Sequence, residues 1–192
     1  MIPAVGDEAG AGSSVRRGLL HLSGSGMADW RADRIGSALR GENPTVLARL
    51  STGFAVIGDS QFLPGYCVLL SDDPTADRLA DLPRARRLAF LADLDLLGQA
   101  VHLVCSRSVP GSRRMNYEVL GNLDTYLHGH IHARYDWEPA HLVTATVAGY
   151  PADVREAADT MLGPQHDQLR AELTEEIRRL HHEQSAYEED ST

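Results

Sequence analysis

The segment that most constrains the fold of this chain is "YLHGHIHARY", which runs from Tyr126 to Tyr135. Every second side chain is polar or basic, namely Tyr126, His128, His130, His132 and Arg134. The positions between them are Leu127, Gly129, Ile131, Ala133 and Tyr135. Because successive side chains of a β-strand point to opposite faces, this period of two predicts a strand with one face on a core. Its other face then lines a site or meets solvent.

The flanking sequence predicts the elements around this strand. Residues 28–40 favour a short helix, which the following "NPT" would end. Between residues 82 and 104, apolar side chains recur at helical spacing and indicate one long helix. Four segments favour strands: "VLARL" and "FAVIGD", which form a hairpin around "STG", then "YCVLLS" and "MNYEVLG". The turn "GNLDT" joins the last of these to the histidine strand, so the two should pair antiparallel.

Together these elements predict an α+β protein, in which one long helix packs on a small antiparallel sheet. Residues 27–150 would form this domain, and residues 151–192 a helical C-terminal extension with an acidic tail. Within the extension, residues 151–163 and 164–183 favour two helices that meet at a Gly-Pro break. The Gly/Ser-rich residues 1–26 are expected to be a disordered tail.

Charge and composition limit the partners of the chain. Its 18 basic and 27 acidic residues give a formal net charge of −9, which argues against nucleic-acid and membrane-surface binding. A small phosphorylated substrate is still compatible with a locally positive pocket. The first residues lack a basic region followed by a sustained apolar core, so a cytoplasmic location is expected. Cys67 and Cys105 lie among apolar residues and are expected to be buried free thiols.

Two motifs and the order of elements between residues 47 and 139 resemble the histidine-triad (HIT) superfamily, and most of all its diadenosine polyphosphate hydrolase-like branch. The motifs are "FAVIGDSQFLPGYCVLL" and "NYEVLGNLDTYLHGHIHARY". The family signature is His-x-His-x-His, followed by two apolar residues and often Pro-Arg. One register starts it at His128 and makes His130 the middle histidine; the other starts it at Tyr126 and makes His128 the middle one. We take the second register, because it keeps the family spacing on both sides of the triad. "GN" then lies before the triad where the family has Gly-Gln or Gly-Asn, and "IHAR" follows it where the family has two apolar residues and Pro-Arg.

The resemblance implies roles for the residues in that register. In the family the middle histidine attacks the α-phosphorus and forms a nucleotidyl-histidine intermediate, which assigns the nucleophile to His128. A neutral imidazole suits this role, because it is nucleophilic near neutral pH and leaves readily from a phosphoramidate. Its other ring nitrogen should donate to a backbone carbonyl. His130 would bond the phosphoryl oxygens or the leaving group, Asn122 and Asn116 would hold the phosphate, and Arg134 would supply positive charge or form an external salt bridge.

Two tyrosines depart from the family pattern. Tyr66 follows "PG" where the family often has histidine, and Tyr126 replaces the first histidine of the triad. One hypothesis is that the exchanges are coupled, with a hydroxyl pair in place of an imidazole pair; the alternative is that each merely packs as an aromatic ring. Upstream, the family's ribose-binding acid aligns with Gly58 by spacing and with Asp59 by chemistry, so we assign the ribose to Asp59.

The resemblance implies a hydrolase that cleaves a dinucleoside polyphosphate or nucleotide conjugate at the α-phosphate. It also implies a homodimer, a small nucleotide substrate and no organic cofactor, although a divalent cation would accompany a polyphosphate. Three alternatives remain open. They are a phosphorylase or nucleotidyltransferase that uses the same intermediate, a nucleotide-binding protein without turnover, and a metal-binding protein that uses the alternate histidines.

Overall fold

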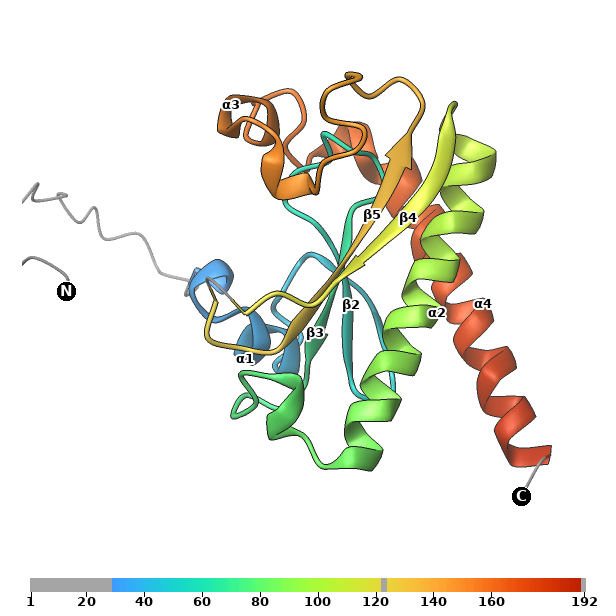
Figure 1. Cartoon of the computed structure of the whole chain (residues 1–192). Helices are drawn as coiled ribbons and strands as arrows, with labels where there is room; N and C mark the ends of the chain where they lie inside the picture. The colour runs from blue at the N-terminus through green and yellow to red at the C-terminus, as the bar shows by residue number, and fades with distance from the viewer. Residues whose placement is uncertain (1–28, 122–123, 191–192) are drawn as a thin grey trace, which may run out of the picture.

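The computed structural model describes residues 29–121 and 124–190, and the overall arrangement is shown in Figure 1. The predicted tail, residues 1–26, lies outside the described residues. So does Asn122, to which the sequence assigns a phosphate contact.

A five-stranded antiparallel sheet forms the centre of the fold, in the order β1-β2-β3-β5-β4. Its strands are β1 (Val46–Arg49), β2 (Gly53–Ile57), β3 (Cys67–Ser71), β4 (Ser112–Glu118) and β5 (His128–Tyr135). The predicted hairpin is therefore confirmed as β1 and β2, and the histidine strand is confirmed as β5. Because β5 pairs with β3 on one edge and β4 on the other, its backbone register is held from both sides.

Helices cover both faces of this sheet. They are η1 (Trp30–Asp33), α1 (Arg34–Leu39), η2 (Leu79–Asp81), α2 (Arg84–Ser108), η3 (Val147–Gly149), α3 (Ala152–Arg155), η4 (Pro164–His166) and α4 (Asp167–Asp190). In Figure 1, α2 and α4 lie side by side on one side of the sheet, and α1 and α3 lie on the other. The α+β architecture with one long helix on the sheet is as predicted, and the short N-terminal helix is present as η1 and α1.

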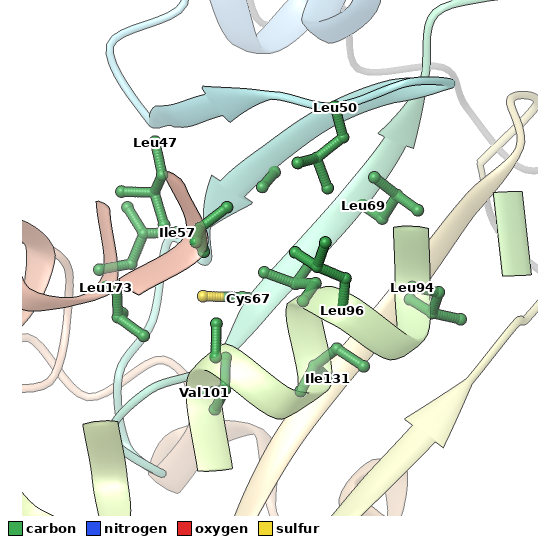
Figure 2. Close-up of a cluster of buried hydrophobic side chains, with 14 of the residues drawn as sticks. Leu47, Leu50, Ile57, Cys67, Leu69, Leu94, Leu96, Val101, Ile131 and Leu173 are labelled. Carbon is green, nitrogen blue, oxygen red and sulfur yellow. The ribbon is translucent and has the colours of Figure 1, made fainter. Parts of the chain in front are cut away.

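The main core lies between the sheet, α2 and α4, and Figure 2 shows part of it. Ile131, Ala133 and Tyr135 of β5 are fully buried in this core, as the alternating pattern predicts. Leu173 and Ile177 of α4 belong to the same cluster, so the C-terminal helix shares one core with the sheet. Both cysteines are free and buried, as expected.

A smaller apolar cluster lies on the opposite face of the sheet. It consists of Ala38 from α1 together with Phe54 and Val56 from β2 and Val68 and Leu70 from β3. The β3 residues are directly opposite two histidines of β5, because Val68 pairs with His130 and Leu70 with His128. The imidazoles therefore stand beside an apolar floor rather than in open solvent.

The loop between β2 and β3 is held by the buried side chain of Gln61. Its amide nitrogen donates to the carbonyls of Gly58 and Tyr66, each at 3.0 Å, and its carbonyl oxygen accepts from the Gly65 amide at 2.9 Å. Gly65 has φ of 85°, a left-handed conformation that glycine adopts without steric cost. This loop therefore presents Asp59 and Tyr66 from a fixed backbone.

The segment that follows β5 is fixed by a buried ion pair. The Arg134 guanidinium lies 2.7 Å from a Glu138 carboxylate oxygen, and both side chains are 5% exposed or less. Arg134 also donates to the backbone carbonyls of Leu142, at 3.1 Å, and Ala145, at 2.9 Å. The Tyr150 hydroxyl donates to the same carboxylate, so residues 138–150 are tied to the end of β5.

The C-terminal extension differs from the prediction in two places. The helix predicted over residues 151–163 is wrong beyond its first turn, since α3 spans only Ala152–Arg155. After α3 the chain pairs with the β2–β3 loop through two backbone hydrogen bonds. The backbone N–H of Gln61 donates to the Thr160 carbonyl at 2.7 Å, and the backbone N–H of Leu162 donates to the Asp59 carbonyl at 2.8 Å. These tertiary backbone bonds override the local helical propensity. The second difference is that α4 continues to Asp190, through most of the predicted acidic tail.

Among the described residues, α2 is the one helix long and apolar enough to cross a membrane by length and composition. In this fold α2 packs against the sheet and against α4, and its residues Phe90, Leu97 and Val101 are fully buried. A core helix of a globular domain satisfies the same criteria.

We predict that removal of one partner of the buried ion pair after β5 strongly destabilises the fold. The change Glu138→Gln leaves the Arg134 charge buried without its partner, so the free energy of unfolding should fall by about 3 kcal/mol. Urea denaturation measures this. The matched control is Glu183→Gln, which breaks an exposed pair on α4 and should leave stability nearly unchanged. Equal losses in the two variants would contradict the prediction.

Candidate active site

A cleft with two connected lobes opens over the histidine face of β5. Their cavities measure about 340 Å³ and 190 Å³, and both are lined by His128, His130, His132, Tyr66 and Arg155. The larger lobe is apolar on one side, where Val56, Phe62, Val68, Leu70 and Met161 line it. The smaller lobe is lined further along by Glu118, Leu120, Val147 and Ala148. The sequence left open whether the polar face of β5 lines a site or meets solvent, and the structure shows that it lines a cleft.

The His128 ring is buried, at 6% exposure, and held by a backbone carbonyl. Its Nδ1 lies 2.8 Å from the carbonyl oxygen of Tyr126, so Nδ1 carries the proton and donates. The hydrogen bond expected for a nucleophilic histidine is thus present. It leaves Nε2 with its lone pair, and the Asp124 carboxylate lies 4.0 Å from that nitrogen.

His130 is held by the hydroxyl of Tyr66. The Tyr66 oxygen lies 2.8 Å from His130 Nδ1. Burial raises the pKa of Tyr66, and the Asp59 charge raises it further, so the hydroxyl keeps its proton. We assign the hydroxyl as donor and Nδ1 as acceptor, because burial, and then the His128 charge, lower the pKa of His130 to about 4. His130 is then neutral near pH 7 and carries its own proton on Nε2.

The ring of Tyr66 is held by contacts with His132 and Gly58. It stacks on His132, with ring centroids 4.3 Å apart and an interplanar angle of 2°. It also lies so close to Gly58 that an added Cβ there would come within 2.0 Å of the ring. Burial, and then His130 and Arg134, lower the pKa of His132 to about 3, and its Nδ1 is buried without a hydrogen-bond partner. His132 therefore serves as a neutral stacking surface.

The two tyrosine hydroxyls have different partners. The Tyr66 hydroxyl is hydrogen-bonded to His130. Burial, and then the charge of Asp124, raise the pKa of Tyr126. Coupling between the two exchanges stays a hypothesis. Both rings do pack against the apolar cluster of β2 and β3. The structure thus places Tyr66 and Tyr126 in the cleft, but it links Tyr66 to the triad through His130.

Asp59 lines the larger lobe and is paired with a residue that sequence reasoning missed. The Arg34 guanidinium lies 2.5 Å from its carboxylate, and both side chains are about a quarter exposed. Arg34 also lies 3.4 Å from the second carboxylate oxygen, and Arg31 lies 3.8 Å from the first. Arg34 comes from α1, which the sequence placed as a helix without a role.

Two predicted substrate contacts are not brought into the cleft. Arg134 as a substrate-binding residue is wrong, because its guanidinium is buried and fully used by Glu138 and backbone carbonyls. Asn116 lies opposite His132 on β4 and donates to Glu118 at 3.3 Å, but it does not line either lobe.

Five charged residues that line the cleft were not found from sequence, namely Arg34, Glu118, Asp124, Arg155 and Glu156. The sequence held a signal for two of them. Glu118 alternates with Asn116 on a strand predicted to pair with β5, and Asp124 lies in the turn between these strands. For Arg34, Arg155 and Glu156 no local pattern pointed to the site. Within the described residues, no group of three or more His, Cys, Asp or Glu side chains is arranged to hold a metal ion.

No family model and no curated protein sequence matches the chain, whereas solved structures do. A histidine triad protein from Sinorhizobium meliloti 1021 is 16% identical with a TM-score of 0.58, over 79% of this chain and 97% of that one. A hypothetical histidine triad nucleotide-binding protein from Sulfolobus tokodaii strain 7 is 11% identical with a TM-score of 0.56, over 77% and 93%. A Zn-bound histidine triad family protein from Mycobacterium smegmatis is 13% identical with a TM-score of 0.51, over 75% and 91%. The expected fold is thereby confirmed as that of histidine triad proteins.

We predict that Tyr66 sets the tautomer of His130. The change Tyr66→Phe keeps the ring on His132 but removes the donor to Nδ1, so the population of the Nδ1–H tautomer should rise. The ¹⁵N chemical shifts of the imidazole at pH 7 measure this. Tyr117→Phe, on the core face of β4, is the control and should leave the His130 signals unchanged. An unaltered tautomer in Tyr66→Phe would overturn the assignment.

We also predict that the buried, neutral His132 makes the folded state less stable in acid. Because His132 has a pKa of about 3 when folded, against the ordinary 6.5, the unfolded chain binds more protons between these values. The free energy of unfolding should therefore decrease as pH falls below 6.5, by up to about 1.4 kcal/mol per pH unit for this one group. His132→Phe keeps a stacking ring and should flatten the dependence, whereas the exposed His182→Gln should not. Parallel pH curves for wild type and His132→Phe would refute this.

Proposed function

We propose that this chain, which has the histidine triad fold, is an enzyme that transfers a nucleotidyl group through His128. The observation that carries the proposal is the hydrogen bond from His128 Nδ1 to the Tyr126 carbonyl. It fixes the tautomer whose Nε2 lone pair faces the cleft. A nucleophile held in this way needs no general base to activate it.

The larger lobe supports a nucleoside as the transferred part. Its apolar side chains suit a base, and the Asp59 carboxylate beside them suits the two ribose hydroxyls. Its cavity of about 340 Å³ is of the size that small-molecule sites have. The solved Sulfolobus structure, described as nucleotide-binding, is consistent with this use of the fold.

The chemistry has two steps. In the first, His128 Nε2 bonds to the α-phosphorus while the bond to the leaving-group oxygen breaks, which gives a nucleotidyl-histidine. In the second, water forms the new bond to phosphorus, His128 leaves, and a nucleoside monophosphate is released with a proton. His130, neutral with Nε2–H toward the cleft, donates a hydrogen bond to a phosphoryl oxygen in both steps.

The finer proposal is that the substrate is a dinucleoside polyphosphate or another nucleotide conjugate and that water is the acceptor. Two lobes that are both lined by the three histidines support it. A transferred nucleotide fills the larger lobe, and the smaller lobe receives the leaving group. No protein group needs to bind a cation for these steps, so a divalent ion would arrive with the polyphosphate.

We predict a covalent adduct on His128. After incubation with diadenosine tetraphosphate and an acid-free quench, mass spectrometry should find an adenylyl group on the peptide that contains His128. His128→Gln should abolish the adduct and lower turnover at least a thousandfold, or about 4 kcal/mol, because the nucleophile is removed. His182→Gln is the control and should retain both.

Product analysis with and without inorganic phosphate identifies the acceptor. Release of AMP in both conditions supports hydrolysis, whereas ADP formed only with phosphate would make the enzyme a phosphorylase. Nucleotide binding without an adduct or turnover would contradict the enzymatic proposal altogether.

A further inference from the structure

The smaller lobe of the cleft has a charge pattern that the nucleotidyl transfer itself does not use. Its charged side chains are Glu118, Asp124 and Arg155. The histidines between them add no charge near pH 7 from His130 or His132, because the pKa of each is lowered well below neutrality by burial. Arg155 is the one arginine or lysine that lines this lobe among the described residues.

Arg155 is held in place by a chain of contacts that begins at β5. The buried Arg134–Glu138 pair binds the Tyr150 hydroxyl, and the Tyr150 carbonyl accepts from Arg155 Nε at 3.1 Å. The ring of Tyr150 also packs against Phe62, with centroids 5.1 Å apart. The half-buried Arg155 is thus positioned by the same network that fixes residues 138–150.

The terminal nitrogens of Arg155 remain available to a ligand. The other cationic side chain in the cleft, Arg34, is paired with Asp59 at 2.5 Å. Arg155 has no ion pair with a described residue, and its side-chain hydrogen bond within the described part of the chain uses Nε only. A guanidinium with both terminal nitrogens unpaired matches the paired oxygens of a phosphate.

From this geometry we propose that Arg155 is a specificity-determining residue that binds phosphates of the leaving group. It selects substrates in which the group displaced from the α-phosphorus carries further negative charge, as in a polyphosphate, over those that release a neutral amine. The inference rests on the proposed nucleotidyl transfer and narrows its substrate class. The C-terminal segment would then supply recognition while β5 supplies the chemistry.

The two carboxylates of the smaller lobe oppose the effect of Arg155 on a polyanion. Glu118 is directly opposite His130 on β4, and Asp124 lies 4.0 Å from His128 Nε2. If Arg155 loses its charge, two carboxylates remain and the lobe repels a polyanion. If Glu118 loses its charge, the lobe becomes more favourable to one. The two changes should therefore shift the preference in opposite directions, which a merely structural role of either residue would not do.

The test compares two substrates that share the adenylyl group. Diadenosine tetraphosphate releases a polyanionic leaving group, and adenosine 5′-phosphoramidate releases ammonia. In Arg155→Gln, kcat/KM for the tetraphosphate should fall about 10- to 100-fold, and kcat/KM for the phosphoramidate should change less than about threefold. Arg155→Lys should retain part of the preference, and Glu118→Gln should lower KM for the tetraphosphate.

The control Arg178→Gln removes the same charge from an exposed position on α4 and should leave both substrates unaffected. Equal losses for both substrates in Arg155→Gln, or an unchanged ratio, would overturn the proposal. If Arg155→Gln unfolds, the ratios for Arg155→Lys and Glu118→Gln decide it by their directions. Wild-type protein that forms no His128 adduct with either substrate would instead refute the proposed function, so the two failures are distinct.

Discussion

The structure depends on β5 being hydrogen-bonded along both edges, with one face in the core and the other lining the cleft. Ile131 and Ala133 enter the core beneath α2, while the side chains of His128 and His130 stand over the cleft. A slip of one residue would place imidazoles in the core and apolar side chains in the cleft. The pairing with β3 and β4 prevents that slip, so the geometry of the site is a direct consequence of sheet register.

Two of the three imidazoles in the cleft are uncharged near pH 7. Burial disfavours the imidazolium form, which lowers the pKa of His130 and of His132. Each of the three rings has a different role. His128 donates to a carbonyl and presents a lone pair, His130 accepts from Tyr66 and presents a proton, and His132 supports the Tyr66 ring. Tyrosine in place of histidine at position 66 therefore adds a donor that cannot itself become a cation.

Sequence reasoning worked where the information is local and periodic. The faces of β5, the hairpin and the long helix follow from spacing alone, and the carbonyl partner of His128 followed from the family resemblance. Sequence reasoning failed where a long side chain could contact either a ligand or another group of the protein. Arg134 has the same local pattern as a ligand-binding residue, yet a glutamate four positions later buries it. The helix expected over residues 151–163 does not form beyond its first turn, because backbone groups of this segment bond to the β2–β3 loop. Neither segment's sequence alone indicates this contact.

The close approach between position 58 and the ring at position 66 links two sites that are eight residues apart. No side chain fits at position 58 while the tyrosine lies where it does, since even one carbon would overlap the ring. Exchange of the tyrosine for a smaller residue would release that restriction, whereas enlargement of the glycine alone would displace the donor of His130. Chains that share this cleft should therefore vary at the two positions together, and a comparison of such chains would reveal them as a covarying pair.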